Sequence, residues 1–305
     1  MLDPRSLYTV HTDVWDSVAE TQPVMLHLLE GYVDAGHLAK QLGEHILGSM
    51  EHEVLVTFDH DQLHDYRSRR PAMVFDANTW TALTDYELAI HKVTDASGRA
   101  FLLLAGPEPD QQWNRACTAL LDITRAMGVS QLVTAQGVPM GVPHTRPVLV
   151  TSHATDPALA PDNPVWIDRV TVPGSFSAML EFRTGQAGRL ARGFVAHVPH
   201  YLAQGNYVPG ALAALERIRD ATGLDLPPGD LAALALQTLA QLEEEVDRDG
   251  EFGPLVTALE EQYDELQATG RPSVPSADEI GAAVEQFLAE RQDGDDTGGS
   301  RGPHQ

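Results

Sequence analysis

Short apolar runs alternate with amphipathic helical stripes through the first two hundred residues, and this alternation constrains the fold more than any other feature. Residues 24–30 have the composition of a buried strand, and the apolar positions from Ala35 to Ile46 then recur at helical spacing, with Asp34 as the expected helix cap. Strands that alternate with helices form a mainly parallel sheet covered by helices, so the expected class is α/β. Further strands are expected at residues 54–58, 87–93, 99–105, 131–135, 148–151, 169–172 and 191–198, and further helices at residues 113–127 and 175–183.

Local turn and capping residues connect these elements. Residues 95–98 (Asp-Ala-Ser-Gly) separate two strand candidates and predict a hairpin turn. Asp110 precedes a helical stripe and is expected to cap that helix. Residues 60–71 are polar and are expected to form a loop.

Beyond Pro209 the pattern changes to helices with narrow apolar stripes and acidic faces. Such stripes suit a helical hairpin that leans on the body or on a partner. A core at residues 1–208 and an acidic helical subdomain at residues 209–270 are therefore expected, followed by a linker, a short helix and a disordered tail at residues 271–305. Within these segments, helices are expected at residues 211–222, 231–246, 255–266 and 277–290, with a turn at residues 247–250 and a linker at residues 272–276.

The acidic charge limits the classes of partner. The 305 residues carry a formal net charge of -24 at pH 7, from 44 acidic and 20 basic residues. Residues 201–305 hold 21 of those acidic residues and six of the basic ones. A field of this sign repels phosphate backbones and anionic membrane surfaces, so neither nucleic acid nor a membrane is expected as a partner.

The cysteine content and the lengths of the apolar runs indicate a cytoplasmic protein. Cys117 is the only cysteine, which excludes an internal disulfide framework and indicates a reducing compartment. No secretory signal is recognisable, and no stretch approaches ~18 consecutive apolar residues. Cys117 lies on the apolar stripe of an expected helix, so an inert core thiol is favoured over a nucleophile.

His60 and His64 have the spacing of a metal-binding pair. On a helix, positions i and i+4 would place both imidazoles on one face, among Asp59, Asp61 and Asp65. No third ligand is indicated, and no glutamate follows as it does in a metalloprotease helix. The favoured interpretation is a solvated polar loop, and no metal is expected.

Arg67, Arg69 and Arg70 form a basic cluster in the segment Tyr66-Arg-Ser-Arg-Arg-Pro71. Guanidinium groups can hold an anionic ligand or a phosphate through two parallel hydrogen bonds. They can equally pair with carboxylates of this protein, within one chain or across a subunit contact. The second interpretation is favoured.

Two histidine-bearing strand ends provide the candidates for a ligand pocket. In open α/β sheets, ligands bind beyond the carboxyl ends of the strands, where His144 and Arg146 follow one strand and His200 and Tyr201 follow another. Together with Glu108 they would supply an acid/base group and an anion holder. A histidine in a proline-flanked turn also serves to hold a loop by hydrogen bonds, and this structural role is the favoured interpretation.

Several well-known catalytic motifs are absent from the sequence. It has no Gly-x-Ser-x-Gly elbow, no Gly-x-x-x-x-Gly-Lys phosphate loop, and no Gly-x-Gly-x-x-Gly that follows a strand. These absences disfavour lipase-type, nucleoside-triphosphatase and dinucleotide-dependent activities. No cofactor is expected.

Four separated segments together carry a family resemblance: residues 65–71 (DYRSRRP), 106–113 (GPEPDQQW), 143–148 (PHTRPV) and 198–201 (VPHY). In this order and spacing they resemble the proteasome assembly chaperone 2 family, in particular its actinobacterial-type members. The resemblance spans roughly residues 20–270. It implies a three-layer α/β/α sandwich related to the phosphorylase/hydrolase-like folds, and a tendency to self-associate. The chain ends Gly-Pro-His-Gln rather than in the hydrophobic-Tyr-any tail by which family members dock on the proteasome, so docking by that route is not expected.

Two hypotheses for the function follow. The leading one is a non-enzymatic assembly chaperone or scaffold that acts as a homo-oligomer, with a trimer as the expected number and with proteasome subunits as the further partner that the resemblance implies. The rival is an enzyme or small-ligand binder, of hydrolase or nucleosidase type, that uses His144, Arg146 and His200. A vestigial pocket in an oligomeric protein is the third possibility.

Overall fold

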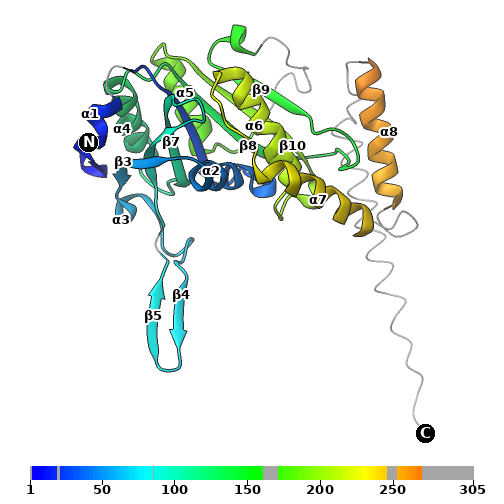
Figure 1. Cartoon of the computed structure of the whole chain (residues 1–305), viewed down its shortest axis with the longest axis horizontal. Coiled ribbons are helices and arrows are strands. Elements are labelled where there is room, and N and C mark those ends of the chain that lie inside the picture. Colours follow the sequence, from blue (N-terminus) through cyan, green and yellow to red (C-terminus); the bar gives the residue numbers. More distant parts are fainter. Residues whose placement is uncertain (1, 19–20, 85, 161–170, 246–252, 270–305) are drawn as a thin grey trace.

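One central sheet organises the chain (Figure 1). In the computed structural model, which describes residues 2–18, 21–84, 86–160, 171–245 and 253–269, the sheet has eight strands in the order β1-β3-β6-β7-β2-β8-β10-β9. The strands β7, β2, β8 and β10 run parallel to one another, whereas β1, β3, β6 and β9 each pair antiparallel. The strands are β1 (Tyr8–Val10), β2 (Val24–Glu30), β3 (His52–Phe58), β6 (Ala89–Thr94), β7 (Ala100–Pro107), β8 (Gln131–Met140), β9 (Val150–Ala154) and β10 (Ala191–Pro199).

The expectation of a mainly parallel sheet is wrong in this respect, because the sheet is mixed. A short turn at residues 95–98 joins β6 to β7, and two strands joined by a tight turn must run antiparallel. Beside β6, the strand β3 again runs antiparallel, so the β1 side of the sheet is antiparallel throughout. The parallel part of the sheet consists of β7, β2, β8 and β10.

Helices cover both faces of the sheet. The helices are α1 (Thr12–Val18), α2 (Leu38–Ser49), α3 (His60–Leu63), α4 (Trp113–Ala126), α5 (Phe176–Gln186), α6 (Val208–Thr222), α7 (Asp230–Glu245) and α8 (Gly253–Thr269), with 3-10 turns at Pro4–Leu7, Ala35–His37, Pro157–Leu159 and His200–Leu202. No helix among the described residues is long and apolar enough to span a lipid bilayer.

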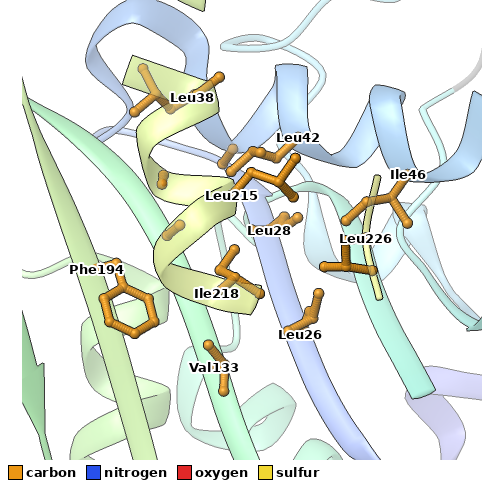
Figure 2. Packing of buried hydrophobic residues seen from close by; sticks show 14 of the residues in the cluster. Leu26, Leu28, Leu38, Leu42, Ile46, Val133, Phe194, Leu215, Ile218 and Leu226 are labelled. Atoms are coloured by element: carbon orange, nitrogen blue, oxygen red, sulfur yellow. The ribbon is translucent and has the colours of Figure 1, made fainter. Parts of the chain in front are cut away.

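Two apolar cores lie on opposite faces of the sheet. Leu26 and Leu28 of β2 face α2 and α6, where they lie in one cluster with Leu42 and Leu215 (Figure 2). The intervening residues of β2 point the other way, and Met25 lies in a second cluster that includes side chains of α4 and α5. A strand that is buried on both faces has apolar side chains on both, which is why β2, apart from His27, lacks the polar alternation of a half-buried strand.

The segment between β3 and β6 departs from the expected loop. Residues 60–63 form the one-turn helix α3, whose N-terminus is capped by the side chain of Asp59 accepting a hydrogen bond from the Gln62 N–H. His64 is buried rather than solvated, and its Nε2 lies 3.3 Å from the carbonyl oxygen of Pro107. The solvated-loop interpretation of this pair of histidines is therefore wrong.

Two further expectations need correction. The Asp110 carboxylate does not cap α4, because it accepts hydrogen bonds from the Asp65 N–H and the Arg69 side chain, and Gln112 precedes the helix instead. Thr171 and Val172 are not in a strand. The rest of that strand candidate, the turn at residues 247–250, the linker at residues 272–276, the helix at residues 277–290 and the tail lie outside the described residues.

A two-stranded hairpin projects from the body at residues for which the sequence predicted no helix or strand. The strands β4 (Met73–Asp76) and β5 (Thr79–Leu83) pair antiparallel around the two-residue turn Ala77-Asn78, and Ala77 adopts a φ of 52°. Every residue of both strands is exposed, and Figure 1 shows the hairpin standing away from the rest of the chain. We call residues 73–83 the arm.

His27 is a polar side chain within the core. It lies in the middle of β2, is fully buried, and neither of its ring nitrogens has a hydrogen-bond partner among the described residues. Burial lowers its pKa from 6.5 to about 4, with Glu181 raising it and His153 lowering it further by smaller amounts. The folded protein therefore holds His27 as a neutral imidazole at pH values where the unfolded chain would protonate it.

The substitution His27→Leu tests this buried imidazole. Because burial lowers the pKa of His27 to about 4, the unfolded chain binds a proton at this residue more readily than the folded protein does. The free energy of unfolding is therefore highest above about pH 6.5, and it falls by ~3 kcal/mol as the pH is lowered to 4. The midpoint of urea unfolding should fall with decreasing pH in the natural protein and fall less steeply in His27→Leu. His11→Leu, at an exposed position, should retain the natural slope. Equal slopes for His27→Leu and the natural protein would contradict the prediction.

Candidate functional site

The loop after β8 carries the first pair of candidate residues. His144 is buried, and its backbone N–H donates a 3.1 Å hydrogen bond to the hydroxyl oxygen of Tyr201. Its ring Nδ1 lies 2.8 Å from the same hydroxyl. Because that oxygen accepts the backbone N–H, the hydroxyl proton can be donated to Nδ1, which suits a neutral imidazole. His200 is exposed, and its ring packs edge-on against Tyr201 at 5.4 Å between centroids.

The structure thus brings His144, His200 and Tyr201 together, as expected from the two strand ends. Tyr201 belongs to the 3-10 turn that follows β10, and β10 lies beside β8 in the sheet. Burial raises the pKa of Tyr201, so its hydroxyl stays protonated at neutral pH. The contact holds the loop of His144 against the end of β10, which is the structural role considered for a histidine in such a turn.

Arg146 is engaged by the last described helix. Its guanidinium group forms a two-pronged contact with Asp264, through Nε to Oδ1 at 2.9 Å and Nη2 to Oδ2 at 2.7 Å. A third hydrogen bond, from Nη1 to Glu260 at 3.2 Å, adds a second carboxylate of α8. Hydrogen bonding to Asp264 raises the pKa of Arg146, and the same contact lowers the pKa of Asp264.

Two neighbours of Arg146 extend this contact between the loop and α8. The Thr145 hydroxyl donates to Glu260, and the Tyr263 hydroxyl donates a 3.0 Å hydrogen bond to the carbonyl oxygen of Pro147. We call the contacts of residues 145–147 with α8 the clamp. The clamp occupies the carboxylate-binding face of Arg146, so an anionic ligand would have to displace Asp264 and Glu260.

A groove opens beside the clamp, between the loop of His144 and the helices α6, α7 and α8. Its volume is about 740 Å³, within the range of ligand-binding clefts. His144 and Arg146 line one end, while Glu216, Glu243 and Glu260 supply acidic groups. We call this cavity the α7 groove, and the apolar part of its lining includes Leu212, Ala213, Ala232, Leu236, Leu239 and Ala240.

Glu108 lies elsewhere on the carboxyl edge of the sheet. It follows β7, and its buried carboxylate accepts the N–H groups of Tyr32 at 2.9 Å and Phe176 at 3.1 Å. A side chain at Gly31 would collide with it, since a Cβ there would lie 2.5 Å from its carboxyl carbon. Glu108 thereby joins the turn after β2 to the first turn of α5. It is absent from the lining of the α7 groove, so the structure separates it from the other pocket candidates.

A second cavity, which the sequence did not reveal, lies beside this turn. It has a volume of about 580 Å³ and sits beyond the carboxyl end of β2. There the connection from β2 leads through α2 to β3, whereas the connection from the neighbouring β7 leads through α4 to β8 on the other side of β2. Ligands of α/β proteins bind where connections diverge in this way. Burial raises the pKa of Asp34 in its wall to about 6. The lining includes Tyr32, Asp34, Gln136, Val138, Val172 and Ser175.

Asp34 was foreseen as a helix cap, and its carboxylate does accept the N–H of Ala39 at 2.8 Å. Its place in a cavity wall could not be foreseen, because residues 136–139 and 172–178 complete that wall.

The three arginines of the basic cluster have different environments. Arg69 donates a 3.0 Å hydrogen bond to Asp110, so the favoured internal ion pair is confirmed for this residue. Arg67 and Arg70 are exposed at the base of the arm, and the carbonyl oxygen of Arg70 accepts a 3.0 Å hydrogen bond from the Tyr86 hydroxyl. The cluster therefore anchors the arm to the body through Arg69 and leaves two guanidinium groups at the surface.

The remaining reactive side chains have structural environments. Cys117 lies on α4 and is buried in the core, as expected, and burial raises the pKa of its thiol to about 12, which disfavours the thiolate. His60 and His64 face each other, with their Nδ1 atoms 3.0 Å apart. Within the described ranges, no group of three or more His, Cys, Asp or Glu side chains is placed to hold a metal ion.

Comparison with known proteins identifies relatives across most of the chain. The model of the PAC2 family matches residues 28–246. The structure of a *Mycobacterium tuberculosis* protein of unknown function, Rv2714, superposes with a TM-score of 0.82 at 38% identity, covering 86% of this chain and 92% of that one. A *Corynebacterium glutamicum* protein of unknown function gives a TM-score of 0.79 at 34% identity, covering 86% and 98%.

A further relative has a more informative name. The *Mycobacterium tuberculosis* proteasome-assembly chaperone homologue Rv2125 gives a TM-score of 0.70 at 26% identity, with 76% of this chain and 99% of that one covered. The search of curated proteins finds no match.

The substitution Arg146→Met tests the clamp. Methionine retains an unbranched stem but removes both hydrogen bonds to Asp264 and the one to Glu260. We expect faster backbone hydrogen exchange in residues 253–269, because α8 loses its charged contacts with the loop. Arg125→Met removes an exposed ion pair with Asp122 on α4 and should leave the exchange of α8 unchanged. Unaltered exchange in Arg146→Met would show that the other contacts of α8, including the hydrogen bonds of Thr145 and Tyr263, hold the helix without Arg146.

Proposed function

Because the chain belongs to the PAC2 family, we propose that it is a non-enzymatic assembly chaperone or scaffold that acts as a homo-oligomer. The observation that carries the proposal is the arm, where Phe75 is 56% exposed and Trp80 is 61% exposed. An isolated two-stranded hairpin is marginally stable in water, and clustered exposed apolar side chains mark interaction sites. The arm therefore requires a surface to cover it, and another protein chain supplies one.

The state of the polar candidates supports a non-enzymatic role. Arg146 is bound by Asp264 and Glu260, and Glu108 by two backbone N–H groups. A catalytic acid, base or anion holder must reach its substrate within hydrogen-bond distance. The rival hypothesis of a hydrolase- or nucleosidase-like site around His144, Arg146 and His200 therefore requires the clamp to open before a substrate can bind Arg146.

The proposed link to the proteasome rests on a relative. The *Mycobacterium tuberculosis* protein named as a proteasome-assembly chaperone homologue is 26% identical over 76% of this chain. We include proteasome subunits among the proposed partners on this ground, and a homotrimer as the proposed oligomer.

Replacing both aromatic residues of the arm, Phe75→Ser with Trp80→Ser, tests the proposed oligomer. Light scattering after size-exclusion chromatography should give the natural protein a mass near three chains and the double variant a mass near one chain, because the apolar contact surface is lost. Phe182→Ser is the matched control, since Phe182 is an aromatic residue that is 62% exposed on α5. A natural protein with the mass of one chain would overturn the proposal.

The proteasome link has its own test. Purified proteasome α-subunits and β-subunits are each mixed with the natural protein, and complex formation is followed by light scattering. Binding to one class of subunit with micromolar affinity or better is expected for an assembly chaperone. Absence of binding to both would remove the proteasome from the proposal and leave the homo-oligomeric scaffold.

A further inference from the structure

The arm has one strongly apolar face. Residues directly opposite each other in a hairpin share a face, and successive pairs alternate between faces. The pairs Met73–Leu83 and Phe75–Trp80 alternate along the arm with Val74–Ala82 and Asp76–Thr79. The register shift between Val74 and Phe75 places Trp80 opposite Phe75, and their rings lie 4.9 Å apart between centroids. Four large apolar side chains therefore lie on one face of the arm.

The α7 groove offers a complementary apolar surface. Leu236 lines it and is 71% exposed, and Ala240 follows one helical turn later on the same side of α7. Leu234 and Leu255 are further exposed leucines on α7 and α8. The part of α7 that lines the groove runs from Ala232 to Glu243, ~17 Å along the helix, and the five residues of β5 also span ~17 Å. The two surfaces are thus of similar length.

The charges of the two surfaces are opposite. Arg67 and Arg70 are exposed at the base of the arm, whereas the exposed Glu216 and Glu243 line the α7 groove beside Glu260, which the clamp already engages. The whole chain has a net charge of -24, so most of its surfaces repel a second copy. Pairing of two arms with each other would leave these arginines without the acidic groups of the groove. A contact between arm and groove pairs opposite charges instead.

The arm cannot reach the groove of its own chain. Figure 1 shows the arm on one side of the body and α8, which bounds the groove, on the other. Two different surfaces of the same chain that fit each other make a head-to-tail contact between copies, and such contacts close into rings when the rotation permits. We infer that the arm of one chain inserts its apolar face into the α7 groove of a second copy, with Arg67 and Arg70 beside the acidic groups of the groove. This inference rests on the proposed homo-oligomer and specifies its interface.

Two variants provide the test, one that disrupts the apolar face of the arm and one that disrupts the α7 groove. The arm variant carries Phe75→Ser and Trp80→Ser. The groove variant carries Leu236→Arg and Ala240→Arg, both at exposed positions where an added side chain points into the groove without disturbing the core. Each variant alone should have the mass of one chain. Mixed in equal amounts they should form a complex of two chains and no larger species, because one intact arm and one intact groove remain.

Three outcomes of the mixing experiment are decisive. A groove variant that keeps the natural mass while the arm variant does not would overturn the arm-in-groove contact and leave the homo-oligomer standing. Two monomeric variants that do not combine would do the same, and would indicate contacts between like surfaces. A monomeric natural protein would overturn both the contact and the homo-oligomer. Circular dichroism spectra that match the natural protein show that each variant is folded.

A charge exchange tests the electrostatic part independently. The pair Arg67→Glu and Arg70→Glu should weaken association at least tenfold at low salt, and so should Glu216→Arg with Glu243→Arg. A chain with all four substitutions should recover most of the natural affinity, because opposite charges again face each other. If all three variants self-associated as tightly as the natural protein does at low salt, the pairing of these groups would be overturned.

Discussion

The burial of β2 on both faces is the constraint on which the rest of the structure depends. This strand lies between β7 and β8 in the parallel part of the sheet, and its side chains alternate between the two apolar cores. Helices must therefore cover both faces, since neither core could otherwise exclude water. At the carboxyl end of β2, the Glu108 carboxylate joins the turn that contains Asp34 to the first turn of α5. One strand thereby fixes the layers of the fold and the position of a cavity.

The polar groups of the candidate site have hydrogen-bond partners within the chain, whereas the apolar side chains of the arm are exposed. The Arg146 guanidinium is held by two carboxylates of α8, the His144 imidazole contacts Tyr201, and Glu108 accepts two backbone N–H groups. The large side chains of the arm, in contrast, stand in water at half exposure or more. Since apolar surface in water costs free energy and satisfied polar groups do not, covering the arm would stabilise the protein. This difference is the physical ground for proposing assembly rather than catalysis in this member of the PAC2 family.

Much of the fold could be predicted because its elements have local signatures. The apolar run of β2, the helical stripe of α4 and the turn at residues 95–98 each lie within a few residues and were placed correctly. The arm was missed, since no buried face imposes a pattern on it and its turn, Ala77-Asn78, lacks glycine; the alternation around that asparagine was the available signal. Asp110 is a residue type that often caps helices, yet the approach of Arg69 and the Asp65 N–H from the neighbouring segment decided its role.

The candidate site shows the same division. His144 and Tyr201 were foreseen at adjacent strand ends, whereas the carboxylates that bind Arg146 come from a helix more than a hundred residues away.

The sequence by itself determined the α/β class, most of the strands and helices, and the acidity that excludes nucleic acid as an expected partner, because periodicity, capping and net charge are properties of neighbouring residues or of composition. The tertiary structure alone decided that the sheet is mixed, that Glu108 is separated from the groove beside His144, and that α8 closes on Arg146. It also placed the arm on a different side of the body from α8 (Figure 1), which bounds the acidic α7 groove. The physical reason is that each of these features depends on which distant segments come into contact, and the free energy of such contacts is set by packing in three dimensions rather than by local sequence.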